Sequence, residues 1–227
     1  MADQPPQLSW REDRIPVSDQ FDDPYFSIQN GLAETEHVFL QGNGLPGRFA
    51  AGFHIAELGF GTGLNMLAAW RAWEQSGAQG ALKFTSFEAY PMAPADMAKA
   101  LAAFPEVGPR AARFLGQWRG SGSCDLGTLQ LEVVTGDARR SLPEWTGEAD
   151  AWFLDGFSPA KNPELWQADL MQAVADHTVP GGSAATYTAA GFVRRGLENA
   201  GFAVQRVPGF GRKRHMTQAV RTEAKVE

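Results

Sequence analysis

Phe53-His54-Ile55-Ala56-Glu57-Leu58-Gly59-Phe60-Gly61-Thr62-Gly63-Leu64-Asn65 runs from an apolar segment through three closely spaced glycines into an amphipathic segment. The apolar residues predict a buried strand over 53–57, and the periodic pattern that follows predicts a helix over 63–73. Glycines at such a junction allow a sharp turn, let a ligand approach the backbone and present amide N–H groups at a helix N-terminus. We therefore expect a small ligand to bind at this glycine loop, residues 59–63.

The spacing of the three glycines restricts the kind of ligand. A dinucleotide fingerprint is Gly-x-Gly-x-x-Gly, which would place the third glycine at position 64, where this chain has Leu64. The third glycine is instead Gly63, so the pattern is Gly-x-Gly-x-Gly. NAD-dependent oxidoreduction is therefore a disfavoured alternative.

The rest of the chain alternates apolar runs with helical stretches, as in a parallel sheet covered by helices on both faces. With 227 residues, the chain is expected to form one α/β domain. We expect an N-terminal arm over 1–50 that packs on the core, a catalytic domain over 51–220 and a tail over 221–227. The segment 116–127, rich in Gly and Ser, predicts an exposed loop. Further strands are expected at 82–88, 129–134, 149–154, 183–187 and 203–207, and further helices at 93–104, 163–174 and 190–200.

Composition narrows the class of protein. The start of the chain lacks the pattern of a secretory signal, and no apolar run is long enough to span a bilayer, so we expect a cytoplasmic protein without membrane contact. One cysteine and four histidines without metal-ligand spacing predict no metal site. The formal charge is −6, yet Lys and Arg gather in the segment from Arg194 onward. Charge alone leaves open whether that basic segment binds an anionic partner or is a solvated surface.

The Gly-x-Gly-x-Gly pattern, with Glu57 two residues before it, resembles the first motif of Rossmann-like class I S-adenosylmethionine-dependent methyltransferases. That resemblance implies S-adenosyl-L-methionine as cofactor. It also gives roles to acids at the ends of later strands: Glu88 would accept the ribose hydroxyls, and Asp137, followed by Ala138, would face the adenine amino group. Ligands of open α/β sheets bind at this carboxyl edge. The residues expected to bind the cofactor in this part of the chain are Glu57, Gly59, Gly61, Gly63, Asn65, Glu88, Asp137 and Ala138.

The fourth strand is followed by Asp155-Gly156-Phe157-Ser158-Pro159-Ala160-Lys161-Asn162-Pro163, which places an acid and an aromatic residue at the same edge. Amine methyltransferases carry their chemistry at this point, although the match to their usual motif is loose. Methyl transfer needs an amine lone pair aligned with the methyl carbon. A carboxylate such as Asp155 can accept a hydrogen bond from the amine and stabilise the positive charge that develops on nitrogen. Asp155 is therefore the expected catalytic residue.

Several segments together resemble the methyltransferase half of MnmC-type enzymes. They are the run 16–27, which contains Phe21-Asp22-Asp23-Pro24-Tyr25-Phe26-Ser27, the run Val38-Phe39-Leu40-Gln41-Gly42-Asn43, the glycine loop with its flanks over 57–65, the segment 150–163 and the run Gly209-Phe210-Gly211-Arg212-Lys213-Arg214-His215-Met216. The resemblance implies N-methylation of 5-aminomethyl-2-thiouridine at the tRNA wobble position, giving 5-methylaminomethyl-2-thiouridine. It further implies that Asp155 holds the amine. Phe157 and Phe26 would border the methyl donor, Tyr25 would border the substrate pocket, and Lys161, Arg212, Lys213 and Arg214 would contact tRNA phosphates.

One departure from that family is the lack of a second glycine-rich unit, so no FAD is expected in this chain. It is similar to a stand-alone form, and a fragment of a bifunctional protein would look the same. An aminopropyltransferase-like enzyme, a small-molecule amine methyltransferase and a non-catalytic S-adenosylmethionine-binding module remain alternatives. The acidic net charge favours the first of these. The basic C-terminal segment and Lys161 beside Asp155 oppose it, because they would repel a polyamine.

Overall fold

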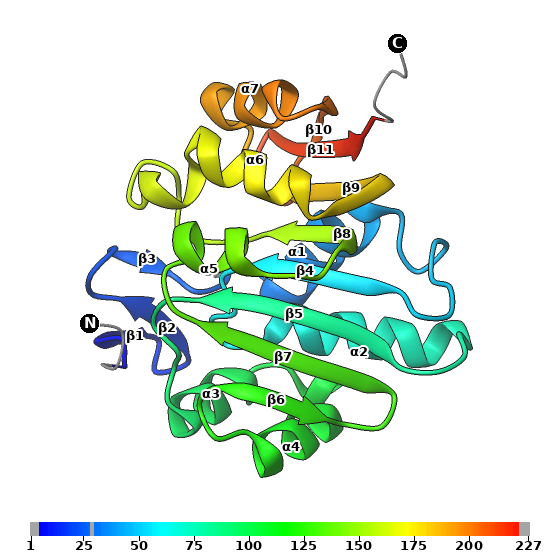
Figure 1. Cartoon of the computed structure of the whole chain (residues 1–227). Coiled ribbons are helices and arrows are strands. Elements are labelled where there is room, and N and C mark those ends of the chain that lie inside the picture. The colour runs from blue at the N-terminus through cyan, green and yellow to red at the C-terminus, as the bar shows by residue number, and fades with distance from the viewer. Residues whose placement is uncertain (1–4, 28–29, 223–227) are drawn as a thin grey trace.

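The structure is a computed structural model that describes residues 5–27 and 30–222. Its centre is an eight-stranded sheet with the order β10-β11-β9-β8-β4-β5-β7-β6 (Figure 1). The five strands from β9 to β7 run parallel to one another, which confirms the mostly parallel sheet expected from the sequence. The strands are β4 (His54–Leu58), β5 (Leu82–Glu88), β6 (Gly122–Asp125), β7 (Leu129–Thr135), β8 (Ala149–Leu154), β9 (Thr178–Thr186), β10 (Phe202–Pro208) and β11 (His215–Arg221).

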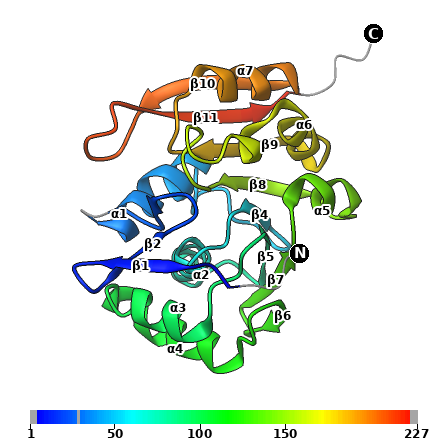
Figure 2. The same ribbon diagram turned by 90° about the vertical axis from the view of Figure 1, so that its left-hand side faces the viewer.

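Helices cover both faces of this sheet (Figures 1 and 2). One buried cluster joins α2 and α4 to the sheet, with Trp70 and Phe114 at its centre. A second cluster joins α5, α6 and α7 to the opposite face, with Trp152 and Leu170 at its centre. The helices are α1 (Gly31–Thr35), α2 (Leu64–Ser76), α3 (Pro94–Leu101), α4 (Gly108–Gln117), α5 (Ala138–Glu144), α6 (Ala168–Asp176) and α7 (Gly191–Asn199), with the short turns η1 (Glu36–Leu40), η2 (Gln41–Asn43), η3 (Pro105–Val107) and η4 (Pro163–Trp166).

The N-terminal segment forms a small antiparallel sheet of β1 (Leu8–Arg11), β2 (Ile15–Ser18) and β3 (Asp23–Pro24). Figure 1 shows this small sheet at the edge of the molecule toward which the arrowheads of β5 and β7 point. Helix α3 contacts β2, and the Lys99 ammonium lies 4.1 Å from the ring centroid of Trp10. Residues 5–27 are the first described part of the expected N-terminal arm, and from here on they alone are called the arm. The arm lies beside the carboxyl ends of the parallel strands.

At the sheet edges one sequence prediction is wrong and one strand was not predicted. The segment 116–127 is not an exposed loop, because β6 pairs antiparallel with β7 and buries Cys124. The strand that was not predicted is β11, which lies between β9 and β10 and pairs antiparallel with both. β11 was missed since its residues belong to the basic C-terminal segment. It reaches Arg221, the first residue of the expected tail, and residues 223–227 of that tail lie outside the described residues.

Two boundaries within the core also differ from expectation. The helix predicted over 163–174 is broken at Gln167, whose extended backbone separates η4 from α6. The strand predicted over 183–187 begins earlier, at Thr178. Its Pro-Gly-Gly sequence resembles a turn, and the structure accommodates it as an irregularity in the pairing of β8 with β9.

Candidate active site

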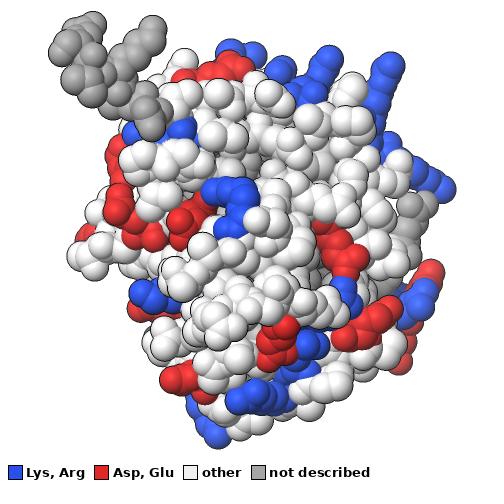
Figure 3. Space-filling model, turned by 90° about the vertical axis from the view of Figure 1, so that its right-hand side faces the viewer, with Lys and Arg blue, Asp and Glu red and all other residues white. Residues whose placement is uncertain are grey.

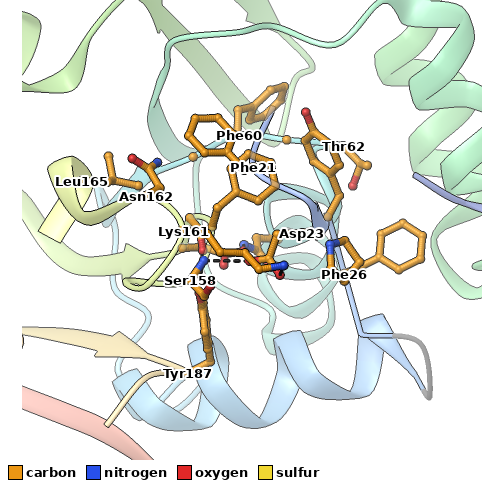
Figure 4. Close-up of a pocket in the computed structure, with 18 of the residues that line it drawn as sticks. Phe21, Asp23, Phe26, Phe60, Thr62, Ser158, Lys161, Asn162, Leu165 and Tyr187 are labelled. Carbon is orange, nitrogen blue, oxygen red and sulfur yellow. Dashed lines mark hydrogen bonds and ion pairs between the residues drawn. The ribbon is translucent and has the colours of Figure 1, made fainter. Parts of the chain in front are cut away.

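A cavity of about 920 Å³ opens at the carboxyl ends of β4, β5, β7 and β8. The arm and α1 close one side of it, and the turn between β10 and β11 contributes Arg212 and Lys213. Figure 4 shows Phe21 near the middle of this cavity, with Phe60 and Tyr187 on opposite sides of the view. The volume lies within the range of small-molecule and cofactor sites.

The glycine loop lines the cavity, and its first glycine lies against the end of β8. Gly59 has a φ of +89°, and a Cβ at this position would lie 2.2 Å from the backbone oxygen of Asp155. The loop then enters α2 through Gly63, whose φ is +77°. Glycine is thus required at position 59 both by backbone conformation and by the closeness of β8.

Glu88 holds the glycine loop in place from the end of β5. Its Oε2 accepts a hydrogen bond from the Gly61 amide at 3.0 Å, and its Oε1 accepts one from the Tyr90 amide at 2.8 Å. Burial raises the pKa of Glu88, and these backbone bonds oppose that rise. A carboxylate has further lone pairs, so Glu88 can still accept hydrogen bonds from ligand hydroxyls in the cavity.

Asp137 caps α5 at the end of β7 by accepting a hydrogen bond from the Arg139 amide at 3.0 Å. The guanidinium of Arg139 also binds both carboxylate oxygens of Asp137, with Nη2 at 2.6 Å from Oδ2. This pairing holds the pKa of Asp137 below its ordinary value. Ala138 and Arg139 border the cavity beside it.

A buried hydrogen-bond network connects the glycine loop with Asp155. The side-chain amide nitrogen of Asn65 donates to Asp155 Oδ2 at 2.7 Å and to Glu57 Oε1 at 2.9 Å. The amide oxygen of Asn65 accepts from the Thr35 hydroxyl at 2.7 Å, and Ser86 donates to the other oxygen of Glu57. Glu57 is fully buried, and burial raises its pKa well above its ordinary value.

Asp155 follows β8 and borders the cavity. Burial raises its pKa to about 7, an increase that the hydrogen bond from Asn65 opposes. The charge of Glu34 raises this pKa further and that of Lys213 lowers it. Asp155 is therefore a carboxyl group that exchanges its proton near neutral pH, as acid–base residues do in enzymes.

The segment after Asp155 is fastened to the arm. The Ser158 amide donates to Asp23 Oδ2 at 2.8 Å, and Lys161 forms an ion pair with Asp23 (Figure 4). Lys161 forms a second ion pair with Asp22. The rings of Phe21 and Phe157 stack with centroids 4.7 Å apart, and Tyr25 meets Phe157 edge-on at 5.1 Å. The arm and the β8 end thus share one wall of the cavity.

Lys213 enters the cavity from the β10–β11 turn. Its Nζ lies 2.8 Å from Glu34 Oε1 and 4.0 Å from the ring centroid of Tyr187. The Tyr187 hydroxyl donates to the backbone oxygen of Gly156 at 2.7 Å, so this ring is fixed next to Asp155. Burial raises the pKa of Tyr187 well above its ordinary value.

Most of the residues predicted for the site line this one cavity, while three do not. Glu57 and Gly63 lie beneath it, where Glu57 bonds Asn65 and Gly63 packs against Phe60. Arg214 is exposed outside it. The sequence interpretation missed Glu34 and Tyr187, which belong to no motif, and gave no role to Phe21 and Asp23, although both lie in the run 21–27 that carries the family resemblance. The predicted residues that line the cavity are Tyr25, Phe26, Gly59, Gly61, Asn65, Glu88, Asp137, Ala138, Asp155, Phe157, Lys161, Arg212 and Lys213.

Within residues 5–27 and 30–222, no helix is long and apolar enough to cross a bilayer. In the same residues, no group of three or more His, Cys, Asp and Glu side chains is arranged to hold a metal ion.

Comparisons with known proteins agree on the class of fold. Residues 106–222 match a family model described as S-adenosyl-L-methionine-dependent methyltransferase. The chain is 48% identical over 226 residues to the tRNA 5-methylaminomethyl-2-thiouridine biosynthesis bifunctional protein MnmC of Chromohalobacter salexigens, covering 93% of this chain and 32% of that protein. The MnmC protein of Pseudomonas aeruginosa is also 48% identical, over 222 residues, with 92% and 34% covered. The chain thus spans about a third of the length of these curated relatives.

A solved structure extends this similarity to three dimensions. The crystal structure of MNMC2 from Aquifex aeolicus superimposes with a TM-score of 0.73 at 26% identity, covering 99% of this chain and 72% of that one. The Rossmann-like class I methyltransferase fold predicted from the glycine loop is confirmed.

Proposed function

The chain belongs to the S-adenosyl-L-methionine-dependent methyltransferase family, and on this premise we propose that it methylates the exocyclic amine of 5-aminomethyl-2-thiouridine at the wobble position of tRNA. The product would be 5-methylaminomethyl-2-thiouridine. The name shared by the MnmC relatives supports this substrate, because it describes biosynthesis of that nucleoside in tRNA. The observation that carries the proposal is the placement of Asp155, an acid of raised pKa held by Asn65 beside the glycine loop.

The residues around the glycine loop fit S-adenosyl-L-methionine. Gly59 and Gly61 border the cavity with backbone, and Glu88 and Asp137 border it with carboxylate oxygens. In this proposal Glu88 holds the ribose hydroxyls, and Asp137 and Ala138 border the adenine. Phe26 and Phe157 border the methyl donor. Glu57 and Gly63 act indirectly, through Asn65 and through the entry into α2. When bound, the cofactor supplies an electrophilic methyl group on its sulfonium.

In the proposed reaction the protein positions the amine and manages its charge. The attacking nitrogen must be neutral, and its hydrogen bond to the Asp155 carboxylate directs the lone pair away from Asp155 and toward the methyl carbon. The same carboxylate stabilises the positive charge that develops on nitrogen as the bond forms. Asn65 keeps Asp155 in this orientation through the 2.7 Å hydrogen bond.

The proposed substrate contacts surround the mouth of the cavity. Tyr25 and Phe157 offer aromatic surface for the base, while Lys161, Arg212 and Lys213 offer positive charge for phosphates. The face opposite the cavity intersperses Lys and Arg with Asp and Glu around a broad uncharged area (Figure 3). Arg214, outside the cavity, would contact a more distant phosphate. Because the proposed substrate is tRNA, we also propose that the protein works in the cytoplasm.

The experiment that tests this function is methyl transfer from labelled S-adenosylmethionine to tRNA carrying 5-aminomethyl-2-thiouridine, followed by mass analysis of the nucleosides. We expect product with the wild type, a loss of kcat of about 100-fold or more with Asp155→Ala, and unchanged activity with Glu198→Gln, an exposed acid on α7. Cofactor binding by the wild type without methylation of this tRNA would contradict the proposal. Transfer of an aminopropyl group to a polyamine would replace it with the aminopropyltransferase alternative.

A further inference from the structure

The ammonium of Lys213 contacts a carboxylate and an aromatic ring at the same time. This ammonium contacts the Glu34 carboxylate at 2.8 Å and lies 4.0 Å from the ring centroid of Tyr187. The Glu34 side chain is only 13% exposed, whereas that of Lys213 is 45% exposed. A mostly buried carboxylate and an aromatic face are a combination that binds alkyl-ammonium groups. We call Glu34 and Tyr187 the ammonium cage.

The ammonium cage adjoins Asp155. The Tyr187 hydroxyl donates a hydrogen bond to the backbone oxygen of Gly156, the next residue after Asp155. The charges of Glu34 and Lys213 both change the pKa of Asp155. Glu34 is also fixed from its own helix, because the neighbouring Thr35 donates to Asn65, which binds Asp155. The cage is therefore held rigidly within the same network that positions Asp155.

We propose that Glu34 and the Tyr187 ring bind the aminomethyl group of the substrate in its ammonium form. Until the substrate arrives, the Lys213 ammonium occupies the position of that group, and the substrate displaces it. The end of a lysine side chain and a protonated aminomethyl substituent are the same chemical group, –CH₂–NH₃⁺. This inference rests on the proposed function and adds to it two residues that select for a cationic amine. Before methyl transfer the bound ammonium passes one proton through the Asp155 carboxylate to solvent, which leaves the neutral nitrogen that attacks. A neutral substituent of similar size gains nothing from Glu34.

Displacement also gives Lys213 a second position. Lys213 lies in the turn between β10 and β11, next to Arg212 at the mouth of the cavity. Once released from Glu34, its ammonium can contact a phosphate of the bound tRNA. Lys213 would then bind the substrate, as the sequence resemblance implies, after it has first excluded other cations from the cage.

The test uses nucleosides, which carry no phosphate, so that only the cage is probed. Calorimetry measures binding of 5-aminomethyl-2-thiouridine and of its neutral 5-hydroxymethyl analogue to the protein saturated with S-adenosylhomocysteine. We expect Glu34→Gln to weaken binding of the amine at least tenfold and to leave the hydroxymethyl analogue within twofold. Lys213→Met keeps the aliphatic stem and removes the competing cation, so it should tighten binding of the amine severalfold. Lys83→Met, an exposed lysine on β5, is the matched control.

Three results would overturn the inference. They are weaker amine binding by Lys213→Met, equal losses of both nucleosides in Glu34→Gln, and no detectable amine binding by either the wild type or Lys213→Met. Failure of the proposed function is recognised separately, because the wild type would then not methylate tRNA that carries the aminomethyl base. Thermal unfolding of each variant verifies that it is folded.

Discussion

The side-chain amide of Asn65 donates to the carboxylate of Asp155 at 2.7 Å, and the same nitrogen donates to Glu57 at 2.9 Å. One neutral residue thus satisfies two acids at the ends of adjacent strands, β4 and β8. Burial raises the pKa of both acids, and the hydrogen bonds from Asn65 oppose that rise. Asn65 therefore stabilises the ionised form of both carboxyl groups.

Asn65→Leu should therefore destabilise the protein. It removes the donor shared by two largely buried acids, so that Asp155 loses its side-chain hydrogen bond and Glu57 keeps only the one from Ser86, and we expect this to lower the free energy of unfolding by about 3 kcal/mol. Ser86→Ala is the control, because it removes one hydrogen bond to Glu57 and should cost about 1 kcal/mol. Urea unfolding at pH 7 measures both. Equal losses in the two variants would contradict the shared role of Asn65.

Asp155→Asn should stabilise the protein in the absence of ligands, and the gain should grow with pH. The pKa of Asp155 is raised from 3.8 to about 7 in the folded protein, so wild-type stability falls as pH rises through that interval. The asparagine variant has no such loss. We expect a gain of about 2 kcal/mol at pH 8, less than the full shift implies because Asp155 retains some contact with solvent.

The measurement is urea unfolding of both proteins at pH 4 and pH 8. Near pH 4 the Asp155 carboxyl is protonated in the folded wild type, so the two proteins should differ little there. A gain of the same size at both pH values would show that the substitution acts through packing and not through charge.

Gly59→Ala should damage both stability and cofactor binding. The added Cβ would lie 2.2 Å from the backbone oxygen of Asp155, so β4 and β8 must separate. We expect a loss of about 3 kcal/mol or more, combining this clash with the strain of a positive φ. Gly77→Ala has a similar φ of +72°, but among the described residues nothing lies within 4 Å of its Cβ, so it should cost only about 1 kcal/mol. Thermal unfolding and calorimetric titration with S-adenosylmethionine distinguish the two variants.

Lys161→Met should loosen the arm without unfolding the core. Lys161 pairs with Asp22 and Asp23, and ion pairs with this degree of exposure contribute about 0.5–1 kcal/mol. We expect amide hydrogen exchange in β2 and β3 to become about two- to fivefold faster, with β4 and β5 unchanged. Lys83→Met provides the comparison, and equal exchange rates in the two variants would mean that Lys161 does not hold the arm.

The strand ends of the site were predictable because they follow from local pattern. Glu88, Asp137 and Asp155 each come directly after an apolar run, and the carboxyl ends of parallel strands meet at one edge. The direction of Glu57 was not predictable in this way. The same strand that carries it to the site turns its carboxylate inward, where Asn65 and Ser86 bind it.

Contacts between distant segments were beyond local pattern. Glu34 lies in a five-residue helix and its partner Lys213 in a turn 179 positions later, and neither segment has a periodicity that indicates the other. The antiparallel insertion of β11 escaped prediction for a related reason. Its pairing with β9 and β10 depends on sheet topology, whereas its sequence shows mainly that the segment is basic.

The separation of Glu34 from Lys213 also has a consequence for the order in which the protein matures. The ammonium cage receives Glu34 early in synthesis and Tyr187 much later, and Lys213 arrives only with the final hairpin of β10 and β11. A chain still emerging from the ribosome can assemble β4, β5, β7 and β8 around their helices and yet lack this wall of the cavity. Contacts of such long range form slowly, so the proposed selectivity for a cationic amine arises only once Tyr187, which follows β9, has joined Glu34.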